Sequence, residues 1–229
     1  MSRLLGLFSS SIGKKYLMAI TGLLLCGFLV LHMGGNVYLF VGEQEYNDYA
    51  HGLHEKEWLV KLVEAGLVVL FVLHIWFALS TTKRNWQARK KRYAEKRSKI
   101  EDPILHARLR AENWMLISGL IVLGFLIWHL LDFTWEVTPP ARQANSLDQE
   151  PYAKAVTILL NPVTSIVYII GPAVLGWHLA HGFASAFQSL GLNHPTFNRA
   201  VRVAGLIFAV LFGLAFAVFP IAVIAGWIG

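Results

Sequence analysis

Five long apolar stretches, separated by polar segments, dominate the chain. A helix needs roughly 20 mostly apolar residues to cross a hydrocarbon core about 30 Å thick, and each stretch is that long. The pattern predicts an all-α integral membrane protein whose helices form one bundle, as a single membrane domain over residues 1–229. The expected helices span about residues 16–40, 58–81, 113–135, 155–190 and 203–227.

Proline, small residues and tryptophan distinguish these stretches. Pro162 and Pro172 predict kinks or a bent start in the fourth helix. The fifth has no ionisable side chain and carries small residues at every fourth position, which is typical of close helix packing. These small residues are Gly205, Ala209, Gly213 and Ala217. An interfacial aromatic belt is indicated by tryptophans near the expected helix ends, namely Trp58, Trp114, Trp135 and Trp227.

Composition agrees with the membrane class and excludes two others. Of 229 residues, 55% are hydrophobic. Cys26 is the single cysteine, so the chain has no internal disulfide and no Cys-x-x-Cys motif for an iron–sulfur cluster or zinc. A net charge of +6 could suggest nucleic acid. However, the basic residues concentrate in one segment between two apolar stretches, so we expect no nucleic-acid partner.

The distribution of lysine and arginine predicts the orientation. Eleven of them lie between Lys83 and Arg110, and sixteen in all fall on the side of the N-terminus. The other side has only four. The positive-inside rule therefore puts the N-terminus in the cytoplasm and the C-terminus outside. The basic segment also suits docking of a cytoplasmic partner or of anionic membrane lipid.

Histidines inside the expected helices are the candidate functional residues, because ionisable side chains within a membrane are costly and usually mark function. They are His32, His74, His129, His178 and His181. The remaining histidines fall in expected loops, where a solvated side chain is the default, and these are His51, His54, His106 and His194.

The depth of these histidines sorts them into two layers. His32 and His129 each lie sixteen residues from the cytoplasmic start of their helices, or about 24 Å along the axis. His74 lies sixteen residues from the outer start of its helix, so it falls toward the cytoplasm. His178 falls in the inner part of a helix that also descends from outside. We expect His32 with His129 in an outer layer and His74 with His178 in an inner one.

Two imidazoles at one depth suit axial ligation of haem iron, and helix bundles build such sites from facing helices. The pattern predicts two b-type haems that carry electrons across much of the bilayer. His181, one turn from His178, could replace it or contact a haem propionate or a quinone. Glycines near the ligands would leave room for a flat macrocycle. A proton channel or transporter that relays protons through histidines is the alternative from another class.

The motifs around these histidines resemble the cytochrome b subunit of bacterial succinate:quinone oxidoreductases, in the single-polypeptide, five-helix, two-haem type found in succinate dehydrogenases and fumarate reductases. The likeness covers nearly the whole chain and rests on the order and spacing of short motifs. The matching stretches are Leu31-His32-Met33-Gly34-Gly35-Asn36, Glu-Tyr-Asn-Asp-Tyr-Ala-His ending at His51, Glu64 followed by Leu73-His74, Ile127-Trp128-His129, and His178-Leu-Ala-His-Gly182.

This resemblance implies the cofactors and the partners. His32 and His129 would hold the haem distal to the cytoplasmic subunits, and His74 and His178 the proximal one. In the family the ligand of the fourth helix precedes a glycine by four residues, which selects His178 over His181. A flavoprotein subunit, where succinate and fumarate interconvert, and an iron–sulfur subunit would dock on the cytoplasmic side. Menaquinone is the expected quinone, and the membrane is the bacterial cytoplasmic membrane.

The chain departs from some family members at one position. Certain fumarate reductases carry a buried acid two residues before the fourth-helix ligand, where this chain has Gly176. A proton pathway through that acid is therefore not expected. Polar or aromatic residues near the distal haem could line a quinone site, namely Asn36, Tyr38, Glu43, Asp132 and Trp135. The dihaem cytochrome b of a formate dehydrogenase, hydrogenase or nitrate reductase is the alternative within the same class.

Overall fold

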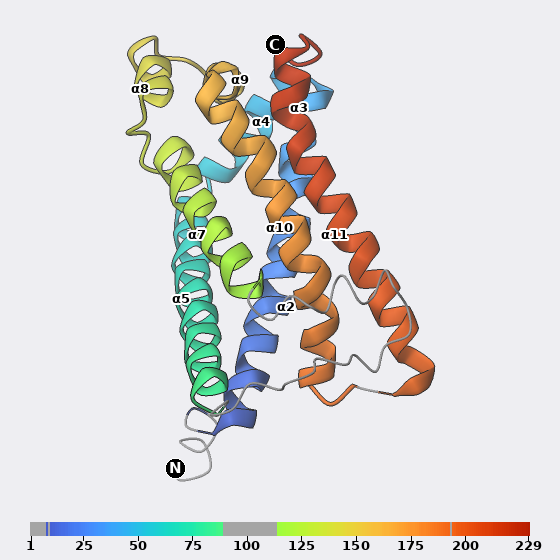
Figure 1. Cartoon of the computed structure of the whole chain (residues 1–229). Helices are drawn as coiled ribbons and strands as arrows, with labels where there is room; N and C mark the ends of the chain where they lie inside the picture. The colour runs from blue at the N-terminus through green and yellow to red at the C-terminus, as the bar shows by residue number, and fades with distance from the viewer. Residues whose placement is uncertain (1–7, 9, 89–113, 193) are drawn as a thin grey trace.

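The computed structural model describes residues 8, 10–88, 114–192 and 194–229, and every regular element in these ranges is a helix (Figure 1). Five helical spans are long and apolar enough to cross a membrane, which confirms the expected fold class. The chain is thus a multi-pass membrane protein. The helices are α2 (Ser11–Asn36), α3 (Tyr38–Val41), α4 (Glu43–His54), α5 (Glu57–Ala88), α7 (Trp114–Phe133), α8 (Pro139–Ser146), α9 (Pro151–Leu160), α10 (Pro162–Ser189) and α11 (Pro195–Ile224).

Two of the long helices begin earlier than expected because a capping residue precedes them. The Ser10 side chain accepts a hydrogen bond from the backbone N–H of Gly13 at the start of α2. The His194 side chain accepts one from Thr196 at the start of α11. Such caps satisfy backbone donors that the first turn leaves unpaired. Arg199 and Arg202, expected in a loop, therefore lie in α11, whereas His106 lies outside the described residues.

The fourth helix, expected over about residues 155–190 with kinks or a bent start at its prolines, is divided into two helices. The chain breaks at Asn161, whose extended backbone separates α9 from α10. The Asn161 side chain accepts hydrogen bonds from the backbone N–H groups of Val163 and Thr164, and Pro162 occupies the first turn. Proline fits that position because its missing N–H would be unpaired there anyway. Pro172, by contrast, lies inside α10 without ending it.

Short helices cover one end of the bundle. Helices α3, α4, α8 and α9 gather near the end of α11, and we call this the capped end (Figure 1). The start of α2, the end of α5 and the connection from α10 to α11 form the opposite, base end. His51 and His54 were expected in a loop but lie in α4, and a His51–Glu150 pair at 2.9 Å ties α4 to the residue before α9.

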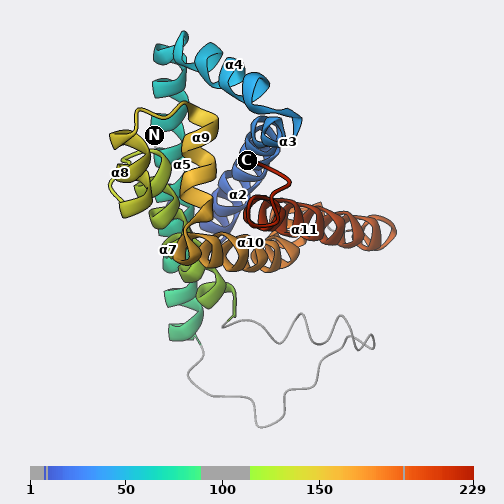
Figure 2. The same cartoon turned by 90° about the horizontal axis from the view of Figure 1, so that it is seen from above.

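Helix α10 lies at the centre of the bundle, where it packs against α2, α7 and α11 (Figure 2). Its crossing with α11 is close because both helices have glycine at the contact. A Cβ added to Gly176 would lie 2.8 Å from the carbonyl oxygen of Ala209 and 3.1 Å from Cα of Gly213. Among the small residues expected to form a packing face on the fifth span, Ala209 and Gly213 pack against Gly176 of α10.

The outward surface of the spans is apolar, as a lipid-facing surface must be. Valine, leucine and isoleucine side chains project from α5 and α11 with about half or more of their surface exposed. Examples are Val68, Val72, Ile207, Leu211 and Leu214. The tryptophans expected near helix ends are found there, and all are exposed.

Candidate functional site

The imidazoles of His32 in α2 and His129 in α7 lie against each other. Their ring centroids are 5.7 Å apart and their planes meet at 82°. Bonds from a metal to imidazole nitrogen are about 2 Å long, as for zinc, so two imidazoles on one metal ion have ring centres about 6 Å apart. The fold thus brings this pair, which we call the capped-end pair, to nearly the spacing that one metal ion between them requires.

Aromatic side chains surround the capped-end pair. The ring of Phe28 stacks on His32 at 5.3 Å, and Phe133 lies 5.4 Å from His129. Phe216 and Phe125 also lie within about 6 Å of one or the other imidazole. These rings come from α2, α7 and α11. Together they form an apolar environment that would suit a porphyrin or another flat apolar group.

Tyr168 of α10 is the polar neighbour of His129. Its hydroxyl lies 3.1 Å from Nδ1 of the imidazole, and its side chain is buried. The same hydroxyl faces the carboxyl group of Asp132, which is fully buried and accepts a 2.5 Å hydrogen bond from Thr138. Partners on the non-ligating nitrogen fix the orientation of a metal-binding histidine, and Tyr168 occupies that position for His129.

His74 of α5 faces a hydroxyl and a glycine that are consecutive in α2. Thr21 Oγ1 lies 3.2 Å from Nδ1 of His74. A Cβ added to Gly22 would lie only 3.1 Å from Cε1 of the same ring. The glycine therefore lets this imidazole approach α2 more closely than a larger residue would allow.

His178 of α10 meets the same arrangement in α7. Ser118 Oγ lies 3.1 Å from Nδ1 of His178, and a Cβ on Gly119 would lie 3.5 Å from Cε1. His178 lies near enough to both His74 and His181 to be influenced electrostatically by them. We call His74 and His178 the base-end pair, because Thr21 precedes His32 in α2 and so lies nearer the base end.

His181 points to a different neighbour from His178. It lines a groove of about 350 Å³ between α10 and α11, and its ring lies 6.1 Å from that of Trp177. His178 instead faces α7 through Ser118. His178 and His181 therefore face different neighbouring helices, α7 and α11.

His32 and His129 are in ring contact, and His178 is influenced electrostatically by His74 and His181. Within the described ranges, no three His, Cys, Asp or Glu side chains converge as a metal site. A metal ion held by two imidazoles needs further ligands, and a porphyrin supplies them in the plane between the two. The described residues therefore fit bis-histidine haem better than a metal ion bound by side chains alone.

The residues considered for a quinone site have different surroundings. The Asn36 side chain donates to the carbonyl of His32, and Tyr38 stacks on Tyr49 at 5.0 Å. Glu43 lies in the first turn of α4, and Trp135 is exposed. Asp132 is fully buried. None of these five side chains lines either of the two pockets found among the described residues, at α4–α5 and at α10–α11.

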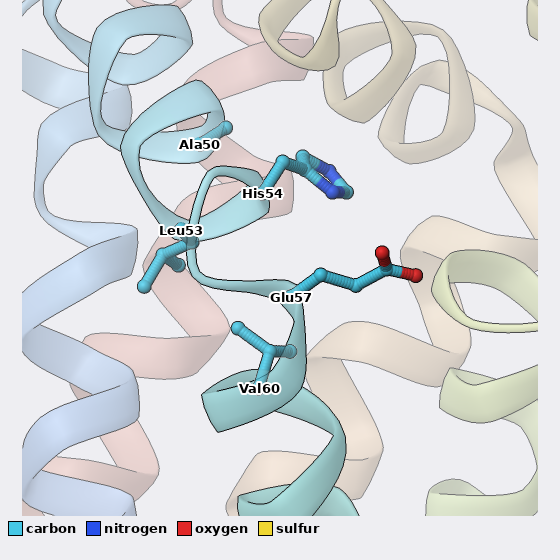
Figure 3. A pocket seen from close by; sticks show the side chains of 5 residues that line it. All are labelled: Ala50, Leu53, His54, Glu57 and Val60. Atoms are coloured by element: carbon cyan, nitrogen blue, oxygen red, sulfur yellow. The ribbon is translucent and has the colours of Figure 1, made fainter.

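A small pocket of about 170 Å³ lies where α4 meets α5, with His54 and Glu57 directed into it (Figure 3). Ala50, Leu53 and Val60 complete its lining. Glu57 is paired with Lys61 one turn along α5, at 2.5 Å. None of the histidines of the two pairs lines this pocket, so it is separate from the candidate site.

Sequence reasoning missed the hydroxyl partners Thr21, Ser118 and Tyr168. For two of them a signal exists in the sequence. Thr21-Gly22 precedes His32 by eleven residues, and Ser118-Gly119 precedes His129 by the same interval. Eleven residues make just over three whole turns, so each hydroxyl and the histidine that follows lie on one face of their helix. Tyr168 offers no comparable signal, since its contact with α7 depends on how the helices pack.

Comparison of the chain with protein-family models, with curated proteins and with solved structures found no match. A functional assignment therefore depends on the side chains described above and on the motif resemblance.

Proposed function

We propose that this chain is the dihaem cytochrome b subunit that anchors a succinate:quinone oxidoreductase in the bacterial cytoplasmic membrane. The observation that carries the proposal is the contact between His32 and His129, whose ring centroids lie 5.7 Å apart on two different membrane spans. The constant rise of a helix independently predicts one depth for both residues. The motif resemblance then supplies the family.

The chain's own residues would hold two b-type haems. His32 and His129 would hold one of them, and His74 and His178 would hold the other. Each haem, when bound, supplies a one-electron redox centre for transfer between an iron–sulfur subunit and membrane quinone. The phenylalanines around the capped-end pair exclude water, and the hydroxyls of Thr21, Ser118 and Tyr168 orient the imidazoles that they contact.

Charge distribution supports docking of the partner subunits at the base end. Sixteen of the twenty lysines and arginines belong to the segments expected on that side, which the positive-inside rule assigns to the cytoplasm. A flavoprotein subunit and an iron–sulfur subunit would bind there, and the dicarboxylate chemistry belongs to the flavoprotein. Most of the basic segment between the second and third spans lies outside the described residues, so its role remains an expectation from sequence. Menaquinone is the proposed quinone.

The proposal is tested by a reduced-minus-oxidised visible spectrum of the membrane-extracted protein, with haem quantified per chain. We expect two b-type haems per chain, together with flavin and iron–sulfur clusters from subunits that co-purify. A preparation without porphyrin would overturn the proposal and return the histidines to a proton-relay role. Two haems without a flavoprotein would instead favour the cytochrome b of a formate dehydrogenase, hydrogenase or nitrate reductase.

A further inference from the structure

The hydroxyl of Thr21 is placed to meet His74 as a hydrogen-bond acceptor. It donates to the backbone carbonyls of its own helix, since Oγ1 lies 2.9 Å from the oxygen of Leu17 and 3.0 Å from that of Met18. A hydroxyl has one proton to donate. When that proton goes to either carbonyl, the contact of 3.2 Å with Nδ1 of His74 uses a lone pair of Thr21, and Nδ1 is the donor. The carbonyl of Met18, which can only accept, faces the same imidazole.

Ser118 stands in the same relation to His178. Its Oγ donates to the carbonyl oxygen of Met115 at 3.2 Å and lies 3.1 Å from Nδ1 of His178. When its proton goes to the carbonyl in α7, the imidazole is again the donor. Both histidines of the base-end pair are thereby held with the proton on Nδ1. In a neutral imidazole this leaves the lone pair of Nε2 available for a metal.

Helices α2 and α7 share one spacing between a hydroxyl residue and a histidine. Each helix carries a hydroxyl–glycine pair and, eleven residues later, a histidine of the capped-end pair. Eleven residues rise about 16 Å along a helix. Each of these two helices thus serves both histidine pairs, contributing a ligand candidate to one and a hydroxyl to the other. The two pairs are consequently held at a fixed separation by the backbones of the same helices.

We propose that Thr21 and Ser118 are positioning residues of the base-end haem, which hold both of its axial histidines in the Nδ1–H tautomer and increase their strength as ligands. The inference rests on the proposed dihaem function and adds to it the residues that tune one of the two haems. An accepted hydrogen bond from Nδ1 makes the imidazole a better donor to iron, and ferric iron gains more from this than ferrous iron.

The test compares isosteric and conservative substitutions in the complete membrane protein. Thr21→Val removes the hydroxyl while keeping the shape, and Ser118→Ala removes the second hydroxyl acting on the same haem. Loss of such a partner typically weakens metal binding 10–100-fold. We expect each variant to keep two haems and to raise the midpoint potential of one of them. A tenfold loss confined to the ferric state corresponds to about 59 mV.

Matched variants separate positioning from packing. Thr21→Ser and Ser118→Thr retain a hydroxyl and should restore the wild-type potential. Ser165→Ala removes a hydroxyl that bonds the carbonyl of Leu159 in α9 and touches no histidine, so neither potential should move. The capped-end haem, which neither Thr21 nor Ser118 contacts, is an internal reference in every sample.

The outcomes distinguish this inference from the function on which it rests. If wild-type protein contains no haem, the proposed function fails and the inference fails with it. If wild-type protein contains two haems but both potentials are unchanged in Thr21→Val and in Ser118→Ala, the inference alone is wrong. If one variant does not accumulate, the other probes the same haem from the opposite ligand.

Discussion

The phenol oxygen of Tyr168 lies 3.1 Å from Nδ1 of His129, across the interface between α10 and α7. Tyr168→Phe removes this contact and leaves the ring in place. We expect both haems to be retained and the potential of the capped-end haem to rise, by roughly 60 mV for each tenfold change in relative affinity. Potentiometric titration of the haem absorbance measures the shift.

The matched control for Tyr168→Phe is Tyr38→Phe, because the Tyr38 ring stacks on Tyr49 and not on a histidine. It should leave both potentials unchanged. A shift confined to the base-end haem in Tyr168→Phe would contradict the assignment of Tyr168 to His129.

Replacement of a single ligand should remove one haem and leave the other. Alanine cannot bind a metal, so His74→Ala loses the base-end haem, whereas His32 and His129 still lie together in their own pair. The measurement is haem per chain and the number of redox transitions. His54→Ala, in the small pocket beside α4, is the control and should keep both haems. Retention of two full haem equivalents in His74→Ala would defeat the pairing.

The crossing of α10 and α11 should not tolerate a methyl group at Gly176. The added Cβ would lie 2.8 Å from the carbonyl oxygen of Ala209 and 3.1 Å from Cα of Gly213. Both contacts are backbone atoms, so the helices must move apart, at a cost of about 1–3 kcal/mol. Thermal unfolding in detergent, followed by circular dichroism, should show a lower midpoint for Gly176→Ala.

Gly66→Ala provides the comparison, since a Cβ at Gly66 has no neighbour within 4 Å among the described residues. Alanine also favours the helix by up to about 1 kcal/mol relative to glycine. We expect its melting midpoint to equal or exceed that of the wild type. Equal midpoints for Gly176→Ala and wild type would show that the crossing is looser than described.

The capped end should become less stable in acid, because Glu136 then becomes protonated. Partial burial opposes ionisation, but hydrogen bonds from Lys154 and Asn145 and the Lys154 charge together hold the pKa of Glu136 below its usual 4.5. The stabilising contribution is therefore complete above pH 4.5 and is lost as the pH falls through the lower pKa of the folded state. This partly exposed pair should contribute at most about 1 kcal/mol.

Hydrogen exchange over residues 136–154, measured from about pH 6 to pH 3 and corrected for intrinsic rates, tests the role of Glu136. Protection should fall at the acidic end in the wild type. In Glu136→Gln protection should be lower at pH 6 and should change less with pH. An identical pH profile in the two proteins would exclude Glu136 as the source.

Some of these features were predictable because they depend on local sequence. Membrane spans follow from continuous apolar stretches, and the matching depths of His32 and His129 follow from the constant rise of a helix. The start of α11 and the break at Asn161 were missed because capping side chains and the local backbone decide helix ends. The helical form of α4 and α8 was missed because neither is a long apolar stretch.

What the sequence determined by itself is the membrane class and the five spans, since each span must be apolar along its own length to lie in lipid. Only the tertiary structure decided which side chains meet across the spans. Thr21 touches His74, Ser118 touches His178 and Tyr168 touches His129 because the helices pack at particular rotations. Those rotations depend on contacts between distant segments, such as Gly176 against Gly213, which no single stretch of sequence encodes.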